Sequence, residues 1–187
     1  MRAAELVDGA CPGLESLVGS DRASVPDLLR ARVEASPDEP FLHWQDRTWS
    51  YAEALNECER FAGFLHHSGL AGGRVAGYTA NRPEAVWAWF GTQIAGGTYV
   101  PLNRSHRGAL LEDMLRRSGA SVLVTDQADD DELERLVTPD LKTTLVAGCD
   151  PGVVPPAAIT YEAVLAAGPW AGRRPRPEQL GMVMYTS

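Results

Sequence analysis

The first hydrophobic runs of the chain switch from helical spacing to strand spacing. Ser24 stands where a helix N-cap is expected, Pro26 falls in the first turn that follows, and the helical pattern ends before Pro37. Two short segments with strand character, at 41–44 and 48–50, then flank a polar turn. This arrangement predicts a helix followed by a small β-hairpin.

A second helix has the clearest boundaries in the sequence. Ser50 is followed three residues later by Glu53, which is the pattern of a capping box. Gly69 lies where a left-handed residue would end the helix. The apolar residues between them are spaced four, three, four and three apart, which predicts one buried stripe formed by Tyr51, Leu55, Cys58, Ala62 and Leu65.

From residue 74 onward, strand and helix patterns alternate. The expected strands are 75–79, 98–102, 122–124, 144–146 and 182–185. The expected helices are 83–94, 107–118 with Leu110, Leu111, Met114 and Leu115 inward, 129–137, and one capped by Thr160. Such alternation predicts an α/β fold, in which a layered, mainly parallel sheet is flanked by helices, with the small N-terminal β-hairpin beside it.

Composition and charge narrow the class of protein. The chain has 187 residues, with 17 Lys+Arg against 25 Asp+Glu, a net charge of −8 and 44% hydrophobic residues. Such an acidic, core-forming chain is not expected to bind nucleic acid, and a cytoplasmic location is expected. We expect residues 1–23 to form a loosely ordered leader and residues 24–187 to form one domain. No stretch is long and apolar enough for a membrane span.

The sequence lacks the motifs of several common enzyme classes. The sequence contains no complete GxxxxGK[ST], no GxGxxG after a strand, no HExxH and no GxSxG. The three cysteines are far apart and form no CxxC pair, so neither a disulfide framework nor a zinc site is expected. No residue of the chain is assigned as a metal ligand or as a catalytic group.

Three segments, taken in order, are more specific than any one alone. They are WSYAEAL at 49–55, IAGGTYVPLN at 94–103 and MVMYTS at 182–187. Together they resemble the adenylate-forming superfamily, which comprises acyl-CoA synthetases, peptide-synthetase adenylation domains and luciferases. The family phrases are similar to "(L/W)(T/S)YxEL", "AGxxYVPLN" and "YTSGTTGxPK". Asn103, where peptide synthetases usually have Asp, favours the acyl-CoA synthetase branch, as does the run from Arg107 to Leu111.

The resemblance implies an AMP-forming ligase that uses ATP, Mg2+ and coenzyme A. The full-length parent would activate a carboxylic acid to an acyl-adenylate and transfer the acyl group to coenzyme A. The chain resembles the N-terminal portion of such an enzyme, truncated at the phosphate loop, so the 187 residues alone are expected to be inactive. The alternative is half of a split enzyme, or a non-adenylating module that performs only the thioester-forming step or has a binding or assembly role.

The resemblance also assigns candidate binding residues. Thr186 and Ser187 match the start of the loop that grips the ATP phosphates. Arg104 and Arg107 are candidate contacts for the phosphates of coenzyme A, although surface arginines at a helix start would have the same pattern. Gly96, Gly97 and Pro101 are interpreted as structural. The expected partners are a small carboxylic acid and the C-terminal remainder of the enzyme or a partner chain, and a homodimer is left open.

Overall fold

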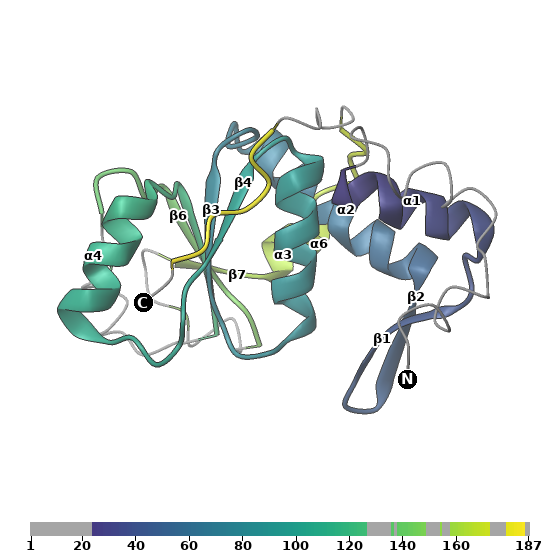
Figure 1. The fold of residues 1–187 in the computed structure, drawn as a ribbon, viewed down its shortest axis with the longest axis horizontal. Helices are drawn as coiled ribbons and strands as arrows, with labels where there is room; N and C mark the ends of the chain where they lie inside the picture. Colours follow the sequence, from purple (N-terminus) through teal and green to yellow (C-terminus); the bar gives the residue numbers. More distant parts are fainter. Residues whose placement is uncertain are drawn as a thin grey trace, which may run out of the picture.

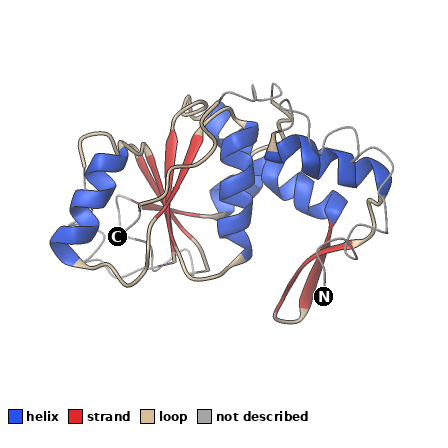
Figure 2. Cartoon of the chain, in the orientation of Figure 1, coloured by secondary structure: helices blue, strands red, loops and turns tan. Residues whose placement is uncertain are grey.

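A five-stranded parallel sheet with helices on both faces forms the main body of the chain, and a two-stranded hairpin projects beside it (Figures 1 and 2). The computed structural model describes residues 24–126, 136, 138–148, 154, 158–172 and 179–185. The expected leader at 1–23, the expected helix at 129–137 except residue 136, and both Thr186 and Ser187 lie outside the described residues.

The N-terminal elements follow the hydrophobic pattern. Helix α1 (Val25–Ala35) and helix α2 (Tyr51–His67) each begin with a capping box, at Ser24 and Ser50 respectively. The hairpin between them joins β1 (Pro40–Trp44) to β2 (Arg47–Ser50) in antiparallel pairing. These predictions are therefore confirmed, and Gly69 has the expected positive φ, at 69°.

The main sheet has the strand order β4-β3-β5-β6-β7, and all its neighbouring pairs are parallel. Its strands are β3 (Arg74–Tyr78), β4 (Thr98–Pro101), β5 (Val122–Thr125), β6 (Thr143–Val146) and β7 (Ala158–Thr160). The helices between or after them are α3 (Pro83–Ile94), α4 (Gly108–Ser118) and α6 (Glu162–Ala166). The predicted α/β class with a mainly parallel sheet is confirmed.

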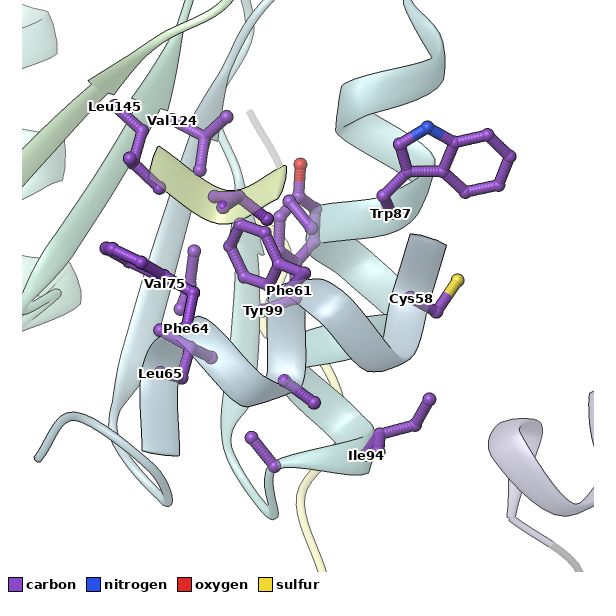
Figure 3. Packing of buried hydrophobic residues seen from close by; sticks show 14 of the residues in the cluster. Cys58, Phe61, Phe64, Leu65, Val75, Trp87, Ile94, Tyr99, Val124 and Leu145 are labelled. Atoms are coloured by element: carbon purple, nitrogen blue, oxygen red, sulfur yellow. The ribbon is translucent and has the colours of Figure 1, made fainter. Parts of the chain in front are cut away.

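Two hydrophobic cores cover the two faces of the sheet, because successive residues of each strand point to opposite sides. Val75 joins the core under α2, α3 and α6, whereas its neighbour Ala76 joins the core under α4. Figure 3 shows the first core, in which Val124 and Leu145 of the sheet lie beside Phe61 of α2. In Figure 1, α4 accordingly lies on one side of the sheet and the other helices lie on the opposite side.

The segment at 182–185 joins the sheet less fully than predicted. It forms a single parallel bridge, between Met182 and Tyr99 on the outer edge of β4, and not a strand. Two backbone hydrogen bonds flank the bridge: Tyr99 N–H donates to Gly181 O and Val183 N–H donates to Tyr99 O, both at 3.0 Å. Beyond Val183, Met184 and Tyr185 are 66% and 36% exposed. They are therefore not buried against the sheet, and the pairing with β4 does not continue through them.

Two further local predictions are wrong. Leu110 is 51% exposed, because it lies about 100° around α4 from the buried Leu111. Thr160 does not cap a helix: it ends the short strand β7, which the pattern did not predict, and Tyr161 precedes α6 without a side-chain cap. Strand β7 has only three residues and is not fully buried, so its sequence carries little periodic signal.

No helix within the described part of the chain combines the length and the apolar character needed to cross a bilayer.

Candidate functional site

The polar groups of the candidate site gather at the carboxyl ends of β3, β4 and β5. After β3 the chain passes through α3 to β4 on one side, and after β4 it passes through α4 to β5 on the other side of β3. Strand order therefore reverses between β3 and β5. Open α/β sheets bind ligands outside the carboxyl ends of their strands at such a switch point.

Asp126, directly after β5, connects all three strand ends. Its Oδ2 accepts a hydrogen bond of 3.2 Å from the backbone N–H of Ala80, which follows β3. Its Oδ1 lies 3.3 Å from Nη2 of Arg104, which follows β4. The Asp126 side chain is only 10% exposed and that of Arg104 is 35% exposed, so the carboxylate is sheltered while part of the guanidinium reaches solvent.

The loop from residue 103 to residue 107 is held by its own polar groups. Arg107 donates to the backbone oxygens of Arg104 and His106 and to the hydroxyl of Tyr78. That hydroxyl in turn donates to His106 O at 2.9 Å. Asn103 Oδ1 accepts from the backbone N–H and the hydroxyl of Ser105, both at 2.9 Å. The guanidinium of Arg107 is thus used within the loop, which presents Arg104 at its surface.

A cavity of about 320 Å³ lies beside this loop, between the end of β4, helix α4 and the segment at 182–185. Asn103, His106 and Met184 are among its lining residues. The Nδ1 atom of His106 and the Nε atom of Arg104 are buried without a hydrogen-bond partner among the described residues. Of these two residues, His106 lines the cavity, and a buried, unsatisfied atom beside a cavity is typical of a place where a ligand or water completes the bonding.

The glycines before β4 set the approach of α3 to the sheet. Gly96 has a φ of 74°, which favours glycine. A Cβ on Gly97 would lie 2.4 Å from the backbone oxygen of Gly73, which accepts a hydrogen bond from Thr98 N–H. Close backbone contact therefore requires glycine at position 97, and the structural interpretation of this turn fits these contacts.

A magnesium site does not form among the described residues. Within them, no group of three or more His, Cys, Asp or Glu side chains could hold a metal ion. The described part of the chain therefore supplies polar and cationic contacts and no metal cage.

A comparison with protein families shows which family the chain belongs to. The sequence profile of the family described as "AMP-binding enzyme" matches residues 29–187. The chain belongs to the AMP-binding enzyme family. This match confirms the resemblance to adenylate-forming enzymes, and it includes all the strands and the loop that carries Arg104.

Relatives of this AMP-binding family member include both peptide and polyketide synthases. The chain is 26% identical to the polyketide synthase PksN of Bacillus subtilis over 165 residues, which is 87% of the chain and 3% of that protein. It is 27% identical to tyrocidine synthase 3 of Brevibacillus parabrevis over 164 residues, which is 86% of the chain and 2% of that protein. The chain therefore spans only a small part of either relative.

A solved structure shows the same fold. The anthranilate CoA ligase AuaEII, in complex with anthranoyl-AMP, has a TM-score of 0.79 and 20% identity to the chain. The match covers 90% of the chain and 33% of the ligase, so the chain spans about a third of that protein. At this level of identity the likeness concerns the fold.

The structure describes two of the four binding residues predicted from the sequence. Arg104 and Arg107 lie on one loop at the carboxyl edge of the sheet, and Thr186 and Ser187 lie outside the described residues. Sequence reasoning missed Tyr78, His106 and Asp126. A signal was available for Tyr78 and Asp126, because Tyr78 is the last residue but one of the predicted strand 75–79 and Asp126 lies two residues after the predicted strand 122–124. Both are near strand ends, where α/β sheets place their ligand contacts.

Proposed function

We propose that the protein to which this chain contributes activates a carboxylic acid with ATP and then transfers the acyl group to coenzyme A. In the first step a carboxylate oxygen attacks the α-phosphorus of ATP, and the acyl-adenylate and pyrophosphate form. In the second step the thiol sulfur of coenzyme A attacks the acyl carbonyl, and AMP leaves. The observation that carries the proposal is the family match over residues 29–187.

Binding and positioning are the contributions we assign to this chain. Phosphoryl chemistry of this kind depends mainly on charge neutralisation and in-line alignment of the reacting atoms. Thr186 and Ser187 would donate their hydroxyl and backbone N–H groups to the phosphates at the start of the loop that binds ATP. No described group fits magnesium, so any metal ligands would come from the phosphates and from residues outside the described part.

Between the two loop arginines, Arg104 is the better candidate for a coenzyme A phosphate. Its guanidinium is partly exposed, and the Asp126 carboxylate holds it in place from one side. Arg107 donates to main-chain oxygens and its guanidinium lies 5.7 Å from the centre of the Tyr78 ring. We therefore assign Arg107 to the shape of the loop and Arg104 to the anion.

A second acceptor has support among the relatives. Peptide and polyketide synthases match most of the chain, so a carrier-bound thiol is an alternative to free coenzyme A. The solved structure that shares the fold is instead named a CoA ligase. Asn103 favours the CoA branch, as the sequence comparison of "VPLN" with the peptide-synthetase phrase predicts. An enzyme that performs only the thioester-forming step is a further alternative.

The test supplies the whole protein with ATP, Mg2+ and a panel of carboxylic acids. Release of pyrophosphate that depends on one acid, followed by consumption of coenzyme A and release of AMP, is the expected result. If adenylation is followed by loading of a carrier protein and free coenzyme A is not used, the acceptor in the second step is the carrier-bound thiol. Turnover of a supplied acyl-adenylate without pyrophosphate release from any acid would support the thioester-forming alternative. The 187-residue chain alone should show neither step.

Arg104→Gln tests the assigned contact in the same protein. Loss of one charge-assisted phosphate contact should raise the KM for coenzyme A by about tenfold and leave the rate of pyrophosphate release nearly unchanged. The matched control is Arg117→Gln, since Arg117 is an exposed arginine of α4 whose side chain is 70% accessible. Equal effects of the two substitutions on the KM for coenzyme A would contradict the assignment.

A further inference from the structure

A second pocket lies apart from the loop that carries Arg104, where the hairpin meets α2, α3 and α6. Its volume is about 480 Å³, which is in the range of small-molecule sites. We call it the hairpin pocket. Three tryptophans, Trp44, Trp49 and Trp87, contribute to its wall. Nothing in the proposed adenylation or thioester chemistry uses these residues.

The charged groups of the hairpin pocket are mainly acidic. Asp46, Glu57 and Glu84 line it together with Arg47, and a second guanidinium, that of Arg82, lies against the Trp44 ring of its wall. Glu84 is already paired with Arg82 at 3.3 Å. Glu57 has no ion-pair partner within the described part of the chain, so its carboxylate is available to a cation. Aromatic walls that displace water strengthen the attraction between such a carboxylate and a positive group.

The aromatic wall already accommodates positive charge from the protein itself. The guanidinium carbon of Arg47 lies 4.3 Å from the centre of the Trp49 ring, and that of Arg82 lies 5.1 Å from the centre of the Trp44 ring. Cations are attracted to the faces of aromatic rings by the ring quadrupole. The indole rings of this wall therefore tolerate a positive group at their faces.

Tyr161, which lines the pocket, carries a buried hydroxyl without a bonding partner among the described residues. The residue is 7% exposed. Burial, followed by the neighbouring Cys58, Glu84 and Glu57, raises the pKa of Tyr161, so the hydroxyl stays protonated. Its oxygen can accept a hydrogen bond and its proton can be donated. A buried polar atom of this kind costs free energy unless something bonds to it.

We propose that the hairpin pocket binds a small molecule that carries a primary ammonium group on an apolar stem. The ammonium group would pair with the Glu57 carboxylate and donate a hydrogen bond to the Tyr161 oxygen. The stem would lie against the indole rings. This inference concerns a site separate from the one that contains Arg104, and it does not depend on the proposed adenylation activity.

Calorimetric titration of the protein with hexylammonium, and with 1-hexanol as the neutral match, tests the requirement for charge. Hexylammonium should bind at least about tenfold more tightly than 1-hexanol, because only the cation pairs with Glu57. Glu57→Gln should remove most of that difference, whereas Glu34→Gln, at an exposed position of α1, should not change it. Equal binding of the amine and the alcohol, or no binding of the amine at millimolar concentration, would overturn the proposal.

A second experiment tests the Tyr161 hydroxyl. Its expected result differs from that of a general loss of folding, which would weaken the binding of every ligand. Tyr161→Phe should weaken hexylammonium but leave hexyltrimethylammonium unaffected, because the quaternary ion has no N–H to donate. Equal weakening of both ions would contradict the assigned hydrogen bond.

A lysine side chain carries the same ammonium group. Tighter binding of N-acetyl-lysine methylamide than of hexylammonium would assign the pocket to a polypeptide and overturn the small-molecule proposal.

Discussion

At the scale of single residues, the Asp126 carboxylate links the ends of three strands. One carboxylate contacts the backbone that follows β3 and the arginine that follows β4, while its own backbone follows β5. Because Asp126 is 10% exposed, those contacts are sheltered from solvent. The geometry of the candidate site thus depends on a residue that need not touch the substrate.

We predict that Asp126→Ala lowers the free energy of unfolding by about 1 to 3 kcal/mol, because Ala80 N–H loses its acceptor and Arg104 loses its partner. Urea denaturation measures the change. The control is Asp113→Ala, which removes exposed ion pairs within α4 and should cost less than about 1 kcal/mol. A control variant that loses as much as Asp126→Ala would show that the interstrand contacts are not special.

At the scale of elements, α2 is stabilised by its cap and by its buried side chains to different extents. Ser50 accepts from the backbone N–H of Glu53, and Glu53 accepts from the N–H of Ser50. Leu65, in the last turns of the helix, is 1% exposed and belongs to the core shown in Figure 3. Leu55 of the predicted stripe is only partly buried.

The two kinds of contact predict a ranking. Leu65→Ala should lower the free energy of unfolding by about 2 to 5 kcal/mol, since it leaves a cavity in a packed core. Ser50→Ala should lower it by about 1 kcal/mol, because one exposed cap is lost. Chemical denaturation of both variants gives the order, and a larger loss for Ser50→Ala would mean that the packing of α2 is wrongly assigned.

The turn from α3 into β4 gives a second prediction at this scale. Gly97→Ala should destabilise the fold by roughly 1 to 3 kcal/mol, because the added methyl group meets the backbone oxygen of Gly73. Gly168→Ala is a matched control: its φ is not positive and no atom lies within 4 Å of the added methyl group. Thermal unfolding of both variants compares them, and equal midpoints would show that the turn can open without cost.

At the scale of the whole molecule, the first core contains ionisable groups that must stay neutral. Burial raises the pKa of Tyr99 from 10.0 to about 12, and it also raises the pKa values of Tyr161 and Cys58. Below pH 10 both the folded and the unfolded chain keep the Tyr99 proton. Between pH 10 and about 12 the unfolded chain releases it first, so the folded state loses relative stability as the pH rises.

We therefore predict that the free energy of unfolding falls as the pH rises above about 10, and that Tyr99→Phe makes this fall shallower. Tyr185→Phe is the control, because Tyr185 is 36% exposed. Urea denaturation across the alkaline range measures the slopes. Parallel slopes for the wild type and Tyr99→Phe would contradict the contribution of this hydroxyl.

Sequence determined the parts of this protein that depend on neighbours within a turn or two. The capping serines 24 and 50, the hairpin, and the alternation of strands and helices are local patterns, and the structure confirms them. The order of three short segments was enough to indicate the family, which the match over 29–187 confirms. Local periodicity does not show how far a segment pairs with a neighbouring strand. For that reason the strand predicted at 182–185 forms only a single bridge in the structure.

Tertiary structure alone decided which distant residues meet. Ala80 and Asp126 are 46 residues apart, and they touch because β3 and β5 pair in a particular register, with Tyr78 opposite Thr125. The same holds for Tyr161, which reaches the hairpin pocket only because α2 and α3 pack between the hairpin and the sheet. Strand register and helix packing result from burial summed over the whole chain, so no local pattern in the sequence specifies these contacts.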